Sequence, residues 1–221
     1  MANHKIAVDK NSYDKRDWIR LVNSLSGFKS ANLLGTVNAA GNTNLSMISS
    51  CFHLGANPPL LGFILRPHSP SSPRHSLLNI NETGFFTLNH INETMYKQAH
   101  QTSARYPYEV SEFTEVGLTE ETIGGFTAPF VKESLVQLGL KCVEVLNIEA
   151  NNTTLVIGEI QKIHIPKESL KEDGFIDLEA CGSLCVSGLD SYHTTSRLSR
   201  LSYAKTDRPT KELTIDGIEL T

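Results

Sequence analysis

The chain has 221 residues, of which 39% are hydrophobic and 20% are charged, a composition typical of one folded domain with appendages. Its formal net charge is −4 and it has no polybasic run, which argues against nucleic acid or an anionic membrane surface as a partner. Residues 1–10 have no apolar signal segment, and no stretch reaches the ~20 apolar residues of a membrane span. We therefore expect a cytoplasmic protein.

Residues 13–26 form the first predicted element. Trp18, Leu21, Val22 and Leu25 recur at helical spacing and form one apolar stripe. Gly27 follows where a C-terminal glycine would end the helix. The pattern predicts a helix that packs against the rest of the fold, and we assign residues 1–30 to this N-terminal segment.

The stretch from residue 32 to residue 66 organises the chain. It predicts two antiparallel strands joined by a turn at 38–42, where Gly41 can take a positive φ, and then a loop and a third strand. The second strand carries Asn44, Ser46 and two further serines among apolar residues. Such a strand is either half-exposed, with alternating polar and apolar side chains, or part of a surface that binds a flat polar ligand.

The remaining elements predict a closed antiparallel barrel with a few covering helices. Residues 105–129 are irregular, which is common in segments that line a site or an interface. Residues after 190 show no core pattern, so we expect 191–221 to be an extension that wraps the barrel or a dimer partner. In chain order we expect a loop at 67–75, helices at 76–83 and 93–105, and strands at 84–91, 135–148, 153–165 and 182–189.

The cysteines and histidines show no metal-ligand spacing, so we predict no metal site. In a cytoplasmic chain of this size, the cysteines are expected to be reduced thiols in or near the core. The four cysteines are Cys51, Cys142, Cys181 and Cys185.

An ordered set of motifs resembles the flavin reductase-like family of FMN-binding split-barrel proteins. The resemblance covers residues 32–192, and its specificity comes from the order of the motifs rather than from any one of them. The motifs are Asn44-x-Ser46-x-x-Ser49-Ser50, Asn57-Pro58-Pro59-Leu60, Gly62-Phe63-x-x-Arg66-Pro67, Ser76-Leu77-x-Asn79-Ile80-x-x-Thr83-Gly84, Ala128-Pro129 and Val156-x-Gly158-Glu159-Ile160.

The resemblance implies a mainly β, Greek-key-type split barrel at residues 31–190, usually a homodimer with FMN near the interface. It also implies an NADH- or NADPH-dependent oxidoreductase that passes a hydride through FMN to free flavin or another small acceptor. The alternative is an FMN-binding electron-transfer protein without NAD(P)H turnover. A related pyridoxamine-phosphate-oxidase-like enzyme fits less well, because its phosphate-binding Arg and Lys pattern is not visible.

The resemblance further implies the residues that meet the cofactor. Along the flavin these are Asn44, Ser46, Met47, Ser49, Ser50 and Cys51. At the phosphate end they are Arg66, Arg74, His75 and Ser76, with Ser76 as a helix N-cap. Arg66 could instead be a surface charge, and Ser76 could only cap its own helix.

Two residues near the end of the resemblance are candidates for chemistry. Tyr192 is expected near the flavin, and the imidazole of His193 could bond a nicotinamide amide or supply a proton. His193 could equally be a surface residue. The chain departs from the family pattern at Arg74-His75-Ser76 and at Leu140-Lys141-Cys142, and the first departure bears on the affinity for the phosphate.

Overall fold

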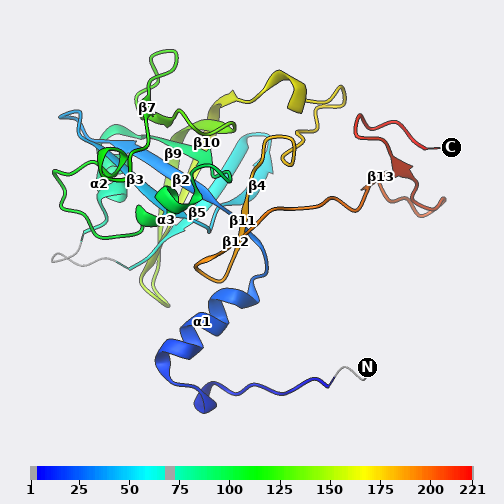
Figure 1. Ribbon diagram of the computed structural model, residues 1–221, viewed down its shortest axis with the longest axis horizontal. Helices are drawn as coiled ribbons and strands as arrows, with labels where there is room; N and C mark the ends of the chain where they lie inside the picture. The colour runs from blue at the N-terminus through cyan, green and yellow to red at the C-terminus, as the bar shows by residue number, and fades with distance from the viewer. Residues whose placement is uncertain (1–3, 68–72, 221) are drawn as a thin grey trace.

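An antiparallel β-sheet forms the centre of the computed structural model, which describes residues 4–67 and 73–220 (Figure 1). Its seven strands lie in the order β3-β2-β6-β9-β10-β5-β4, and each neighbouring pair is antiparallel. The predicted mainly β fold is confirmed. The strands are β2 (Asn32–Val37), β3 (Thr43–Ile48), β4 (Phe52–Ala56), β5 (Pro59–Leu65), β6 (Phe85–His90), β9 (Gln137–Ile148) and β10 (Thr153–His164).

Short helices and small sheets surround this barrel. None of the described helices is long and apolar enough to cross a membrane. The helices are η1 (Lys10–Ser12), α1 (Lys15–Leu25), α2 (His75–Thr83), α3 (Tyr96–Gln101), α4 (Glu112–Val116) and η2 (Lys167–Ser169). The small strands are β1 (Lys29–Ser30), β7 (Glu120–Glu121), β8 (Phe130–Val131), β11 (Cys185–Ser187), β12 (Ser191–His193), β13 (Arg200–Leu201) and β14 (Glu212–Leu213).

Two apolar cores lie on opposite faces of β2 and β3. Neighbouring residues of a strand point to opposite faces, so Leu34 belongs to an inner core with Phe63 and Phe86. Leu33 belongs to an outer core with Phe113 and other residues of α3 and α4. Each side chain of β3 therefore faces either the inner or the outer core.

A serine two residues beyond the end of β3 closes the barrel. Ser50 Oγ accepts a hydrogen bond from the backbone N–H of Ile64 and donates one to its carbonyl oxygen, both at 3.0 Å. Ile64 lies in β5, near the opposite edge of the sheet. The Ser50 side chain therefore links the end of β3 to β5 through two hydrogen bonds, as backbone groups link two paired strands.

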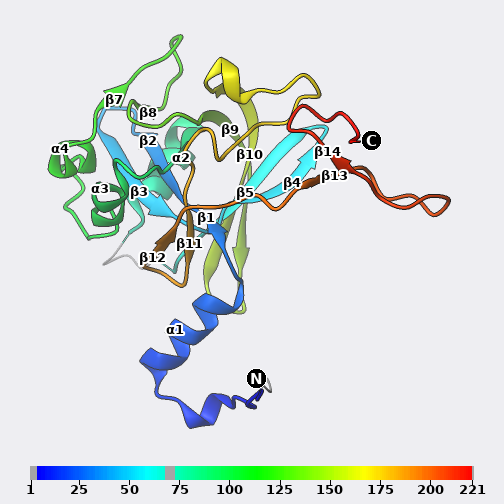
Figure 2. The same ribbon diagram turned by 45° about the vertical axis from the view of Figure 1, so that its right-hand side comes forward.

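Helix α1 stands away from the barrel (Figures 1 and 2). Asp14 caps it by accepting a bond from the Asp17 N–H at 2.8 Å, and Gly27 follows its end with φ +75°. The helix is thus present as predicted. Its predicted packing against the barrel is not seen within this chain, because none of its residues is buried and Leu25 is 73% exposed.

The C-terminal extension also projects from the barrel, as both views show (Figures 1 and 2). The sequence predicted no regular structure here, but the first part of the extension forms a strand. This strand, β12, pairs with β11, which in turn pairs with β1. Beyond β12, Arg200 pairs with Asp173 and lies 4.1 Å from the ring centre of Phe175. These contacts hold the β13–β14 hairpin on the segment around residue 175, so wrapping of a partner stays a prediction.

Most predicted elements are found, with two changes in extent. The helix expected at 93–105 shrinks to α3, and the loop expected before the third strand contains β4. The turn glycine Gly41 has φ +87°, as its position predicted, and Asn152 takes φ 56° in the turn between β9 and β10. Of the predicted loop at 67–75, residues 68–72 lie outside the described part of the chain.

Candidate functional site

Four polar side chains form one continuous hydrogen-bonded chain where β3 meets α2 and α4. Asn44 Nδ2 donates to both carboxylate oxygens of Glu112, at 2.8 and 2.7 Å. Ser76 Oγ donates to Asn44 Oδ1 at 2.7 Å, and Ser46 Oγ lies 3.0 Å from Ser76 Oγ. The structure thus brings together three of the predicted site residues. We call Glu112, Asn44, Ser76 and Ser46 the relay.

Glu112 is the relay member that sequence reasoning missed. It is 4% exposed, at the start of α4, and its Oε2 also accepts the N–H of Leu45 at 2.9 Å. Burial raises the pKa of the Glu112 carboxyl, and the bonds from Leu45 and Asn44 oppose that rise. The only signal in the sequence was its place in an irregular segment.

The alternation of β3 separates the residues predicted along the flavin. Asn44 and Ser46 belong to the relay, whereas Met47 points to the opposite face and packs against the outer core. Ser50 is engaged with Ile64 in closing the barrel. Burial raises the pKa of the Cys51 thiol to about 11, so this thiol is protonated at neutral pH and packs against the inner core.

Basic side chains gather on the other side of Ser76. The pKa of the Arg74 guanidinium is lowered by burial and by the positive charges of Arg105 and Arg66. Burial and the charge of Arg66 likewise lower the pKa of Lys29. Within the described residues no carboxylate pairs with these four cations. Lys29 Nζ already donates to the carbonyl oxygens of Asn23 and Gly188. The three arginines have no carboxylate partner among the described residues, and like charges that approach each other in this way favour an anionic ligand.

Arg74 has a buried hydrogen-bond donor to spare. Its Nη2 donates to the carbonyl oxygen of Pro67 at 3.3 Å, but its Nε is buried and has no partner among the described residues. A buried donor without an acceptor costs about 1–3 kcal/mol. A phosphate oxygen is an acceptor that would satisfy it.

Helix α2 begins one residue earlier than the sequence suggested. Arg74 takes the N-cap position without a side-chain cap bond, and Ser76 lies inside the first turn, where its hydroxyl donates to Asn44. The prediction of Ser76 as the N-cap is therefore wrong. His75 meets the ring of Tyr108 edge-on, at 4.9 Å between ring centres. Burial lowers the pKa of His75, an effect that Glu109 opposes and Arg74 reinforces.

Tyr192 and His193 lie on β12, away from the relay. Tyr192 packs against the outer core, its hydroxyl lies 3.0 Å from His100 Nδ1, and burial together with Asp190 raises its pKa to about 12. His193 Nε2 lies 2.9 Å from Ser187 Oγ and 3.2 Å from Ser191 Oγ. A cavity of about 230 Å³ beside Tyr192 is lined by Tyr96, Lys97, His100 and Asp190.

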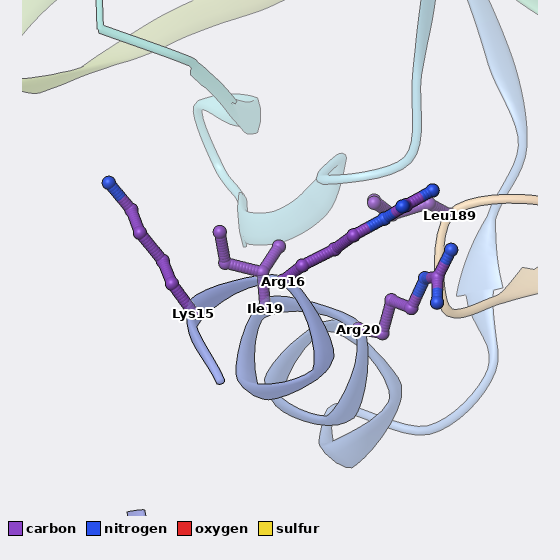
Figure 3. Close-up of a pocket in the computed structure, with 5 residues that line it drawn as sticks. All are labelled: Lys15, Arg16, Ile19, Arg20 and Leu189. Atoms are coloured by element: carbon purple, nitrogen blue, oxygen red, sulfur yellow. The ribbon is translucent and has the colours of Figure 1, made fainter. Parts of the chain in front are cut away.

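A second cavity, of about 410 Å³, lies between α1 and the turn that follows β11 (Figure 3). Arg16 and Arg20 of α1 extend toward Leu189, and Ile19 lies between Lys15 and Arg16 on the helix. It has no lining residue in common with the relay or the basic cluster. Among the described residues, no group of three or more His, Cys, Asp or Glu side chains could hold a metal ion.

Known structures with the same architecture define the class as a split-barrel protein. A candidate flavin reductase with a split barrel domain from Shewanella frigidimarina is 49% identical, with a TM-score of 0.86 over 90% of this chain and 100% of that one. Nitrilotriacetate monooxygenase component B from Bacillus cereus is 20% identical, with a TM-score of 0.77 over 90% and 100%. Flavoredoxin from Desulfovibrio vulgaris is 21% identical, with a TM-score of 0.65 over 81% and 91%. The last two show the fold alone.

The family follows from a direct match. The model of the flavin reductase like domain matches residues 25–185, which is most of the chain. The protein therefore belongs to the flavin reductase-like domain family, and its class is that of flavin-related oxidoreductases.

Proposed function

We propose that the protein is an FMN-dependent oxidoreductase that takes its electrons from NADH or NADPH. The observation that carries the proposal is the juxtaposition of a polar relay on β3 with a basic cluster at the start of α2. The first suits the polar edge of a flavin, and the second suits a phosphate. The family match and the 49% identical candidate flavin reductase support the same activity.

The residues present fit FMN at its phosphate end. Arg74 Nε is a buried donor that lacks an acceptor among the described residues, and Arg66 and Arg105 add positive charge around it. A phosphate dianion would supply the missing acceptor and relieve the repulsion between the arginines. Arg66 is exposed, and its positive charge near Arg74 supports the phosphate-binding role proposed for it.

The chain's own groups would bind and orient the cofactor. Bound FMN would supply the hydride and electron chemistry, so no side chain needs to act as a nucleophile. Ser46 would meet the flavin from the relay, and Ser49, half-buried beyond β3, could meet it further along. Ser50 and Cys51 would shape the site through barrel closure and packing.

Tyr192 is proposed to contribute from the cavity that it lines with His100. The raised pKa of its hydroxyl keeps it protonated, and its one proton is available to a cosubstrate in the tautomer of His100 whose Nδ1–H donates to the tyrosine oxygen. The role of His193 as a proton donor stays a prediction. His193→Gln is its test: a proton supplied to reduced flavin belongs to the reduction step, so anaerobic reduction of the bound FMN by NADH or NADPH should slow in this variant.

The visible spectrum of the purified protein tests the proposal. Protein reconstituted with FMN should absorb near the flavin bands, and anaerobic mixing with NADH or NADPH should bleach them rapidly. Protein that stays colourless after incubation with FMN would refute the proposed function. The nucleotide that bleaches faster at equal concentration identifies the cosubstrate, and free flavin or another small acceptor should restore the colour.

The second candidate is the alternative left open by the sequence, an FMN-binding electron-transfer protein without NAD(P)H turnover. Flavoredoxin from Desulfovibrio vulgaris shares its fold. A protein of this kind would bind FMN but would show no bleaching with either nucleotide. A chemical reductant such as dithionite should then reduce the bound flavin in a control sample.

The working unit is proposed to be a homodimer with FMN near the interface, as the family resemblance implies. Apolar side chains left uncovered on α1 support this assembly, since Val22 is 43% exposed, Leu25 73% and the following Phe28 69%. A second copy of the chain is the occupant proposed for this face.

A further inference from the structure

The relay has a direction, which is set by its buried end. In its ionised form Glu112 only accepts hydrogen bonds, and it accepts from the Leu45 N–H and from Asn44 Nδ2. The amide of Asn44 must therefore turn its NH₂ group toward Glu112. Its carbonyl oxygen then faces Ser76, which donates to it at 2.7 Å.

The same logic fixes the proton of the last hydroxyl. Ser76 has one O–H, which is used on Asn44, so the 3.0 Å contact between Ser76 and Ser46 requires Ser46 to donate. Ser46 has then spent its only proton, and two lone pairs remain. Because Ser46 is half-buried whereas Ser76 is buried, Ser46 is the exposed end of the relay.

We infer that Glu112 is a positioning residue that makes Ser46 a hydrogen-bond acceptor toward the ligand. Ser46 thereby selects an N–H or O–H donor, such as a flavin imide or a ribityl hydroxyl, and disfavours an anionic oxygen at that point. This inference rests on the proposed function for the identity of the ligand. Glu112 itself touches no ligand and acts only through Asn44 and Ser76.

Three substitutions that hardly change side-chain volume separate the effect of hydrogen-bond direction from the effect of packing. Glu112→Gln places an N–H opposite the Asn44 amide, so the amide is no longer held in one orientation. Adding Asn44→Asp places an acceptor-only group next to Ser76, while the introduced glutamine amide can donate to it, so the direction is enforced again. Ser46→Ala removes the hydroxyl through which the relay is proposed to contact the ligand.

Fluorescence titration with FMN measures the outcome. Glu112→Gln should weaken FMN binding about tenfold, as expected for a hydrogen bond turned from acceptor to donor. The Glu112→Gln/Asn44→Asp double variant should recover most of that loss. In a Ser46→Ala background, Glu112→Gln should have almost no further effect on FMN binding.

Two results would overturn the inference. One is an equal loss of FMN affinity from Glu112→Gln with and without Ser46, since the effect would then not pass through the relay. The other is a double variant that folds with the melting temperature of the single variant and binds no better. The melting temperatures of the FMN-free variants measure separately how much the Glu112–Asn44 interaction contributes to the stability of the fold. Wild-type protein that binds no FMN would instead refute the proposed function and, with it, the ligand assigned to Ser46.

Discussion

At the scale of single residues, the phosphate end of the site depends on Arg74. Replacing Arg74 with Gln removes a charge and the buried Nε donor that lacks a partner in the described chain. A charge-assisted bond contributes about 1.5–3 kcal/mol, so the dissociation constant for FMN should rise roughly tenfold or more. The affinity for riboflavin, which has no phosphate, should stay the same.

The matched control for Arg74 is Arg16→Gln on α1, which lines the other cavity. It should leave both affinities unchanged. An equal loss of FMN and riboflavin binding in Arg74→Gln would place the arginine away from the phosphate.

His90 makes the stability of the fold depend on pH. Burial lowers its pKa from 6.5 to about 4, and its Nδ1 lies 3.0 Å from Ser183 Oγ. The unfolded chain binds the proton more tightly, so the stabilisation is complete above pH 6.5 and is lost as the pH falls toward 4. The loss should be on the order of 2–3 kcal/mol.

Urea unfolding at about pH 7.5, 6, 5 and 4 measures this dependence. His90→Gln should be less stable than wild type at neutral pH but should show a smaller decline between pH 6.5 and 4. The same decline in both proteins would assign the effect to other groups. His100→Gln, a change at an exposed histidine of α3, is the control.

At the scale of elements, barrel closure depends on one side chain. Ser50→Ala would leave both backbone groups of Ile64 without their partners, at a cost of about 1–3 kcal/mol in the free energy of unfolding. Ser49→Ala removes a neighbouring hydroxyl that bonds to no described residue, and it should cost far less. Chemical denaturation compares the two variants, and similar losses would mean that Ser50 does not close the barrel.

The β13–β14 hairpin is held by a small set of contacts. Arg200 pairs with Asp173 and stacks on Phe175, whereas Lys211 and Glu219 pair only within the hairpin region. Arg200→Ala should loosen the hairpin, so that trypsin cleaves faster at Lys205 and Arg208, which are exposed, and should leave the barrel's melting temperature almost unchanged. Lys211→Ala should alter neither, because exposed ion pairs contribute little. A large drop in melting temperature for Arg200→Ala would show that the hairpin supports the barrel.

At the scale of the whole molecule, the uncovered face of α1 predicts self-association. Light scattering should give the mass of a dimer for the wild type and that of a monomer for Val22→Glu/Leu25→Glu, because burying two carboxylates at an apolar contact is costly. Lys15→Glu on the same helix should stay dimeric. A wild-type monomer at high concentration would contradict the proposed assembly.

Local patterns predicted most of the fold, because strand alternation and turn residues act over short distances. The long strands β9 and β10, the turn at Asn152 and the helix before Gly84 follow from such patterns. The packing of α1 could not be predicted in this way, since an amphipathic stripe shows that one face of a helix is apolar but not what covers that face. A single sequence cannot distinguish a barrel from a second subunit as that cover.

The candidate site was predicted in part, for a similar reason. Asn44, Ser46 and Ser76 stand in motifs, so their residue types alone mark them as candidates. Glu112 does not stand in a motif. Its bonding partner Asn44 is 68 residues away in the sequence, and its own segment shows no regular spacing of apolar residues. A buried carboxylate resembles any surface glutamate until the chain is folded around it.

The alternation of β3 has a consequence for protein engineering. Deleting one residue between Asn44 and Ile48 would move the later side chains to the opposite face and exchange the relay positions with those of the outer core. Insertions at the exposed turn of residues 39–42 leave that register intact. Library design should therefore vary the length of the turn and keep the length of the strand constant.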